Sequence, residues 1–264
     1  MRNQRPKPGS RLALARESRE SRGMGELGNV SLSGTTYHPM FSQDLKYSAQ
    51  VVGDAPDDQV NATISLMRQY ALEDSTCPEI QVEAEALRAT NGGDPYRLVS
   101  AVWQTVRGKV QFLRDEVLGS PLEAFMSRTN ADGTPVTPIV EILIRPRDMH
   151  NMAAARLGDC DDFSMYAASL LTALDIPCNF VTVAGDESNP NIFTHVYVAA
   201  YPNGERVVVD ASHGPECGWE VYRPSGRKQE WAVSGNAPNA GMSVGWLVAA
   251  GVAVLGFVLC GGKL

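Results

Sequence analysis

The stretch RLGDCDDFSMYAASLLTALDIPCNFVTV, residues 156–183, decides the fold. It places Cys160 among three aspartates, directly before an apolar run that predicts a buried helix over about residues 159–174. A structural cysteine prefers apolar surroundings, whereas the backbone N–H groups at a helix start stabilise a thiolate. The pattern therefore makes Cys160 a candidate nucleophile.

A nucleophilic cysteine needs a histidine to take its proton and a third group to orient that histidine. His195 lies in THVYVAAY and Asp210 lies at the end of ERVVVDAS, two strand-like segments joined by Pro202-Asn203-Gly204. With this turn, residues whose numbers add up to about 407 face each other, which places Tyr197 opposite Asp210 and His195 two residues further along the strand. His195 and Asp210 are then predicted to share one face of the sheet, although a slip of one residue would separate them.

The rest of the pattern predicts an α+β fold, with helices first and an antiparallel sheet after them. Three segments have helical character: residues 56–73, 77–90 and 94–115. Residues 116–137 are rich in Gly, Ser, Thr, Asn and Pro and indicate a loop or insertion. VEILIRP, residues 140–146, predicts a short extended segment, and NFVTVAG, residues 179–185, predicts the strand before His195.

These motifs resemble the transglutaminase-like superfamily, which is related to papain-like thiol enzymes. In that family a GDC motif opens the nucleophile helix and an LGIP-type turn leads into the first strand; LGDC and LDIP occupy these places here. THVYVAAY and VVVDAS are similar to its His and Asp strands, and VRGKVQFLRDE and EILIRP resemble the preceding segments of bacterial and phage-associated members. The resemblance covers about residues 94–212 and implies a nucleophile helix packed on an antiparallel sheet.

Carried over by position, the resemblance makes Cys160 the nucleophile, His195 the general base and acid, and Asp210 the orienting carboxylate. The backbone N–H of Cys160 is expected to be one oxyanion donor. The second donor is open, because Phe112 falls where relatives often carry a hydroxylated aromatic side chain. Asn151 and Arg156 are weak substitutes for it.

Charge separates the N-terminus from the rest of the chain. Residues 1–23 carry seven Lys/Arg and two Glu, a net charge of +5. Because the whole chain has a net charge of -7, the remaining residues carry a net charge of -12. This balance gives no indication of a nucleic-acid-binding main domain, and it leaves weak contact with nucleic acid or anionic lipid through the basic arm. A solvated arm without such a partner is the simpler interpretation. The predicted organisation is a flexible basic arm (1–45), a helical N-terminal region (46–93), a catalytic domain (94–232), a linker (233–240) and a transmembrane helix (241–262).

The cysteines and histidines do not predict a metal or a cofactor. The five cysteines are odd in number and form no CxxC motif, so reduced thiols are expected, with a single structural disulfide as the alternative. The four histidines, His38, His150, His195 and His213, have no zinc-type spacing to the cysteines. Asp161 and Asp162 are expected to favour the helix N-terminus rather than to bind a cation.

The C-terminal segment differs from the body of the chain. Residues 241–262 contain no charged side chain, and a helix of this length would span about 33 Å, enough for a hydrocarbon core of about 30 Å. We expect a single-pass anchor in a bacterial inner membrane or a virion membrane, with a helix buried in a partner as the alternative. Arg223, Arg227 and Lys228 precede the segment and favour a cytoplasmic main domain.

The sequence thus predicts a membrane-anchored thiol peptidase or amidase that acts on a protein or peptide through a thioester. Cross-linking by transamidation is the second prediction, because nothing in the residues selects the acyl acceptor. The rival belongs to another class: a structural component of a phage virion or membrane assembly, with envelope or virion partners and an inactive triad. Thiol reactivity of Cys160 separates the enzyme from the scaffold.

Overall fold

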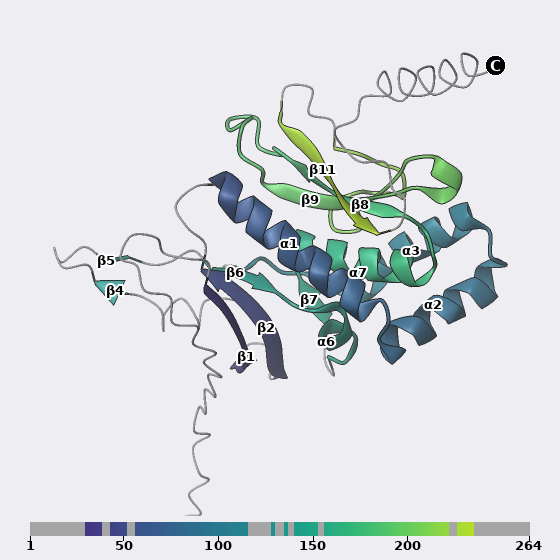
Figure 1. Cartoon of the computed structure of the whole chain (residues 1–264), viewed down its shortest axis with the longest axis horizontal. Helices are drawn as coiled ribbons and strands as arrows, with labels where there is room; N and C mark the ends of the chain where they lie inside the picture. The colour runs from purple at the N-terminus through teal and green to yellow at the C-terminus, as the bar shows by residue number, and fades with distance from the viewer. Residues whose placement is uncertain are drawn as a thin grey trace, which may run out of the picture.

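The protein was analysed as a computed structural model, which describes residues 30–38, 43–51, 56–115, 128–129, 135–136, 140–152, 156–221 and 226–234. The chain is an α+β protein in which a layer of helices packs on a four-stranded antiparallel sheet (Figure 1). The sheet has the order β10-β9-β8-β11, formed by Val207–Val209, His195–Ala200, Cys178–Val183 and Lys228–Ser234.

Helix α7, Cys160–Ala173, is the centre of the core. It packs on β9 and β8, and it is surrounded by α1 (Pro56–Asp74), α2 (Pro78–Asn91) and α3 (Pro95–Lys109). Most α7 side chains are buried, which explains why the segment is apolar around nearly its whole circumference. The largest fully buried side chains of this core come from several of these elements: Met67, Ile80, Tyr166, Leu170, Leu171 and Phe180.

The helix ends follow local sequence rules. Helix α3 begins at Pro95 after Asp94, whose carboxylate accepts hydrogen bonds from the amides of Tyr96 and Arg97. Helix α2 also begins with a proline, and it ends at Gly92, which has a φ of 68°. The LDIP turn after α7 uses Asp175 with a φ of 59°, a conformation that aspartate tolerates better than most residues.

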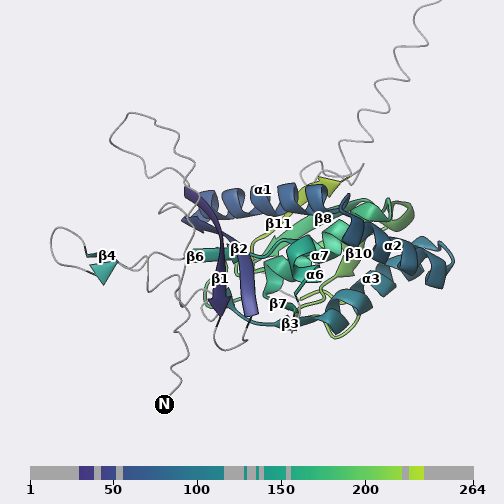
Figure 2. The ribbon, with the colours of Figure 1, turned by 90° about the horizontal axis from the view of Figure 1, so that it is seen from below.

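Two smaller sheets flank this body. β1 (Val30–His38) pairs with β2 (Gln43–Val51), and β2 pairs with β6 (Val140–Leu143), both antiparallel. Figure 2 shows this sheet at the end of the molecule away from α2. β3 (Val110–Phe112) pairs in parallel with β7 (Arg156–Gly158), so it lies directly beside the strand that leads into α7. The remaining elements are short: β4 (Arg128–Thr129), β5 (Pro135–Val136), α6 (Pro146–His150) and a 3₁₀ turn, Pro202–Gly204.

The predicted helices and strands are mostly confirmed. α1, α2, α7, β6, β8, β9 and β10 lie where the patterns predicted them. The hairpin register is confirmed as well, because Val207 faces Ala200 and Val209 faces Val198, pairs whose numbers add up to 407. The connection is wider than a two-residue turn, since residues 201–206 lie between the strands.

Several boundaries differ from the prediction. The helix expected over residues 94–115 ends at Lys109, because Val110–Phe112 pairs with β7 instead. Residues 30–38 of the predicted flexible arm form β1, and the predicted helical region 46–93 begins within β2. The structure also has no core boundary at residue 93, since α1 and α2 share one hydrophobic cluster with α7.

The C-terminal predictions fall mainly outside the described residues. β11 runs to Ser234 and so takes up the start of the predicted linker at 233–240. The predicted membrane helix, residues 241–262, is not among the described residues and stays a prediction. Among the helices that the structure does describe, none is long and apolar enough to cross a membrane.

Candidate active site

Cys160 is the first residue of α7. Asp159 is the N-cap: its carboxylate lies 3.3 Å from the amide nitrogen of Asp161, while the Asp162 carboxylate accepts a hydrogen bond of 3.2 Å from the Asp159 N–H. This reciprocal capping box fixes the start of the helix. The first N–H groups of a helix lack intrahelical acceptors and carry a partial positive charge, so the thiol stands at the end that favours an anion.

The fully buried carboxylate of Asp162 holds this helix start in the fold. Its second oxygen, Oδ1, accepts a hydrogen bond of 2.7 Å from the amide of Ile144, immediately after β6. Gly158 leaves the necessary space, because a Cβ at this position would lie 2.5 Å from the Cβ of Asp162. The glycine of the GDC motif therefore permits a close packing that a side chain would prevent.

Ser164 connects the Cys160 turn of α7 to the strand that carries His195. Its hydroxyl lies 2.6 Å from the carbonyl oxygen of Cys160 and 3.2 Å from that of Val196. Val196 follows His195 directly in β9. The first turn of α7 and the start of β9 are thus held together by one buried side chain.

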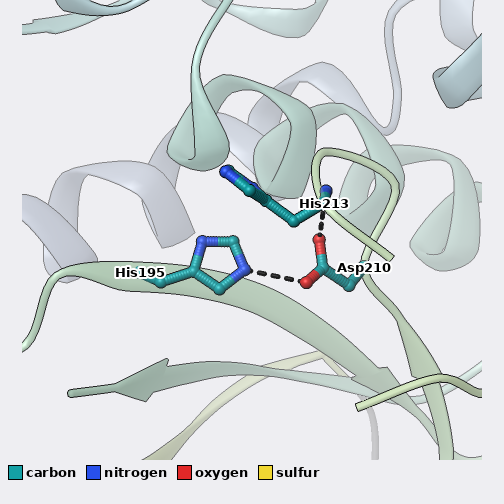
Figure 3. A group of neighbouring side chains, drawn as sticks. All are labelled: His195, Asp210 and His213. Carbon is teal, nitrogen blue, oxygen red and sulfur yellow. Dashed lines mark hydrogen bonds and ion pairs between the residues drawn. The ribbon is translucent and has the colours of Figure 1, made fainter. Parts of the chain in front are cut away.

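His195 and Asp210 are brought together as the register predicted. His195 Nε2 lies 2.8 Å from Asp210 Oδ2, and both side chains are largely buried, with exposed fractions of 11% and 1% (Figure 3). Because an ionised carboxylate only accepts hydrogen bonds, the Nε2 of His195 carries the proton. The neutral imidazole then has its lone pair on Nδ1, which is the atom that can act as a base.

Asp210 is held as a carboxylate. Burial by itself would raise its pKa, but the hydrogen bond from His195 and the positive charge of that ring when it is protonated outweigh burial. The His213 amide and the Ser212 hydroxyl add two further hydrogen bonds, each of 3.0 Å, to Asp210 Oδ1. The net result is a pKa below the ordinary value for aspartate.

His213 is a site residue that the sequence reasoning missed. Its ring centroid lies 4.7 Å from that of His195 in an edge-on arrangement and 5.0 Å from that of Phe112. Burial and the neighbouring His195 lower its pKa. The turn after β10 returns the chain over the site, because the Gly214 N–H bonds to the Asp210 carbonyl at 3.1 Å. A Cβ on Gly214 would lie 2.6 Å from that oxygen, so this close turn requires glycine. The Ser-His-Gly sequence at residues 212–214 was therefore the signal that could have predicted the turn and placed His213 at the site.

The second oxyanion donor remains unassigned. Phe112 lies at the site, 37% exposed and next to His213, but its ring cannot donate a hydrogen bond. The two substitutes considered from sequence are engaged elsewhere. Arg156 donates to Tyr166 and to the His150 carbonyl, and the Asn151 amide is directed at a glutamate in α2.

Three groups of side chains have metal-ligating atoms within 4.8 Å of one another in the described part of the chain. They are His195 with Asp210 and His213, Asp159 with Cys160 and Asp161, and Asp115 with Asp159 and Asp162. The third group is bound to backbone amides, since Asp115 Oδ2 accepts from Ile142 and Asp162 accepts from Ile144 and Asp159. The groups at the α7 start therefore already have a role in capping and strand attachment.

Two of the other described cysteines, Cys178 and Cys217, are unsuited to catalysis. Cys77, Cys160, Cys178 and Cys217 form no disulfide with one another. Burial raises the pKa of Cys178 in β8 to about 11 and also raises that of Cys217. Both thiols are therefore held in the protonated, unreactive form at neutral pH.

Comparison with known proteins does not assign the chain to a family. No family model and no curated protein matches the chain. A solved structure from Cytophaga hutchinsonii, described as a putative cysteine protease, aligns with 76% of this chain and 68% of its own chain. The sequence identity is 15% and the TM-score is 0.30, which is too low to establish a common fold. The site itself has to carry the functional argument.

Proposed function

We propose that this chain is a thiol hydrolase of the peptidase or amidase class, with Cys160 as nucleophile, His195 as general base and acid, and Asp210 as the orienting carboxylate. The observation that carries the proposal is the 2.8 Å contact between His195 Nε2 and Asp210 Oδ2, at the start of the strand to which Ser164 ties the Cys160 turn. This is the order of groups that thiol acyl transfer requires: nucleophile, base, orienter.

The proposed reaction has two balanced steps. In the first, His195 Nδ1 takes the thiol proton, Sγ bonds to the amide carbonyl carbon, and the C–N bond breaks as the same proton passes to the leaving amine. In the second, His195 deprotonates a water molecule that attacks the thioester, which releases the carboxylic acid and restores the thiol. The positive end of α7 stabilises the thiolate and the oxyanion in both steps.

Selective alkylation of the full-length protein tests the proposal. Iodoacetamide should modify Cys160 faster than Cys77, Cys178 and Cys217 at a pH below the ordinary thiol value of about 8.5, with the modified residues located by mass spectrometry. His195→Ala should remove this advantage. If Cys160 in the wild-type protein reacts no faster than Cys77, which is also partly exposed, the hydrolase proposal fails.

Turnover is tested with an activated ester. Incubation with p-nitrophenyl acetate should give a burst of nitrophenol and an acetyl adduct on Cys160, both absent from Cys160→Ala. Adding methylamine then separates the two acyl-transfer outcomes: acetate as product supports hydrolysis, whereas N-methylacetamide supports transamidation.

The alternative function, a scaffold with an inactive site, is favoured by one observation. Phe112 occupies the position where a hydrogen-bond donor is expected and leaves the oxyanion with the donors of the α7 start. A scaffold would give no acetyl adduct on Cys160 even with excess ester.

A further inference from the structure

The proposed hydrolase leaves His213 without a function, although it lies directly on the His195–Asp210 pair. One ring nitrogen of each histidine and one carboxylate oxygen of Asp210 all lie within 4.8 Å of one another. Figure 3 shows the His213 side chain crossing above the His195 ring, with its backbone nitrogen bonded to Asp210. Side chains that can ligate a metal therefore converge from the start of β9, the residue after β10 and the turn that follows it.

We propose that His195, Asp210 and His213 form a binding site for a divalent transition-metal cation of the zinc class, and that occupation of this site switches off Cys160. Two imidazoles and one carboxylate are a set that binds Zn²⁺ with a fourth position left open for water. The binding part of the proposal is independent of the hydrolase, whereas the switching part rests on the proposed function.

The distances permit a metal with small movements. Bond lengths of about 2.0–2.1 Å in a tetrahedral site place ligand atoms about 3.3 Å apart. His195 Nε2 and Asp210 Oδ2 lie 2.8 Å apart and need to separate by a fraction of an ångström. His213 is exposed at the surface, so it marks an entry path for the ion.

The surroundings of Asp210 match those of a metal ligand. Metal-binding carboxylates are usually held by hydrogen bonds through the oxygen that does not ligate. Here Oδ1 accepts from the Ser212 hydroxyl and the His213 amide, while Oδ2 faces His195. One oxygen is thus fixed by the turn and the other is directed into the cluster.

Binding would inactivate the thiol through a proton shift on His195. When Nε2 coordinates the cation, its proton has to leave, and the neutral imidazole then carries its proton on Nδ1. That is the nitrogen proposed to accept the Cys160 proton, so the metal-bound histidine has no lone pair left for the thiol. The metal and the acyl-transfer reaction therefore exclude each other.

Calorimetric titration of the full chain with ZnCl₂ tests the binding, and Co²⁺ absorption reports the ligand geometry. We expect one saturable site in the wild-type protein and an affinity at least about tenfold lower in His213→Ala, since one of three ligands is lost. His150→Gln is the matched control, because His150 lies in α6 beside Glu83 and outside the cluster. It should bind zinc like the wild type.

Cys160→Ser separates this site from the competing group of Asp159, Cys160 and Asp161. The proposal expects unchanged zinc affinity in Cys160→Ser and, in the wild type, slower iodoacetamide labelling of Cys160 once zinc is bound. Loss of zinc binding in Cys160→Ser, or unchanged binding in His213→Ala, overturns the site. If zinc binds as expected but Cys160 is unreactive even without zinc, the hydrolase proposal fails while the metal site stands.

Discussion

The hydroxyl of Ser164 in α7 lies 3.2 Å from the carbonyl oxygen of Val196 in β9. This contact joins the two elements that carry Cys160 and His195, one turn and one residue away from them respectively. Cys160 and His195, the proposed nucleophile and base, come from segments 35 positions apart in the sequence, so their relative position depends on how α7 docks on the sheet. Ser164 is the polar residue that fixes this docking.

Ser164→Ala is therefore expected to lower both stability and thiol reactivity. Loss of the buried hydrogen bond should reduce the free energy of unfolding by about 1 kcal/mol in urea denaturation. Labelling of Cys160 should slow several-fold because the helix start is less firmly held. Ser169→Ala is the matched control, since Ser169 is equally buried in α7 but bonds only to Met165 in the same helix. If Ser169→Ala slows labelling as much as Ser164→Ala, the contact with β9 has no special role.

Gly158→Ala tests the close packing beneath the nucleophile. The new methyl group would lie 2.5 Å from the Asp162 Cβ and displace a carboxylate that holds both Asp159 and Ile144. We expect a loss of about 1–3 kcal/mol in the free energy of unfolding. Gly108→Ala is the control, because a Cβ there meets nothing within 4 Å and alanine favours the α3 helix. Equal stability of the two variants would contradict the packing argument.

The sequence predicted the fold best in buried elements with continuous apolar runs and in strands joined by a recognisable turn. α7 and β8 are apolar on nearly all sides because each is enclosed by other elements, and such runs are easy to locate. The register of β9 and β10 followed from Pro202-Asn203-Gly204 even though the connection is longer than a tight turn. A residue-number sum was enough to place Tyr197 opposite Asp210, and strand alternation then placed His195 on the same face.

The parts that were missed depend on pairing with distant partners. β3 has the composition of a helix end, and only its pairing with β7 makes it extended. β11 pairs with β8, a segment far back in the chain that sequence patterns do not connect to it. His213 escaped notice because its position depends on the turn from Asp210 to Gly214 rather than on strand alternation. Histidine spacing alone cannot show such a return of the chain.

The ion-pair cluster around Glu220 provides a separate pH prediction that does not involve Cys160. Burial by itself would raise the pKa of Glu220, but hydrogen bonds from Arg206, Lys228 and Tyr197 lower it from 4.5 to about 2. A folded-state pKa below the unfolded value stabilises the fold above pH 4.5, and this contribution is lost as the pH falls toward about 2.

Glu220→Gln should therefore be less stable than the wild type at neutral pH, and the difference should shrink steadily below about pH 4.5 in urea denaturation. The same substitution at Glu216, which is exposed on the preceding turn, should reproduce the wild-type pH profile. A difference between Glu220→Gln and the wild type that stays constant down to pH 2 would show that the cluster does not hold Glu220 ionised.

Asp210→Asn gives the sharpest test of how the site holds its protons. Asparagine has a single acceptor oxygen. Two donors, the Ser212 hydroxyl and the His213 amide, both favour this oxygen at the position that Oδ1 now occupies. The amide NH₂ then faces His195 Nε2 and donates to it, so the imidazole proton moves to Nδ1. That tautomer cannot take the thiol proton, and burst formation with p-nitrophenyl acetate should fall by about 10²–10⁴-fold while the fold is retained. Asp175→Asn, at an exposed ion pair with Arg88, should keep the wild-type rate. A wild-type rate in Asp210→Asn would mean that the carboxylate does not set the tautomer of His195.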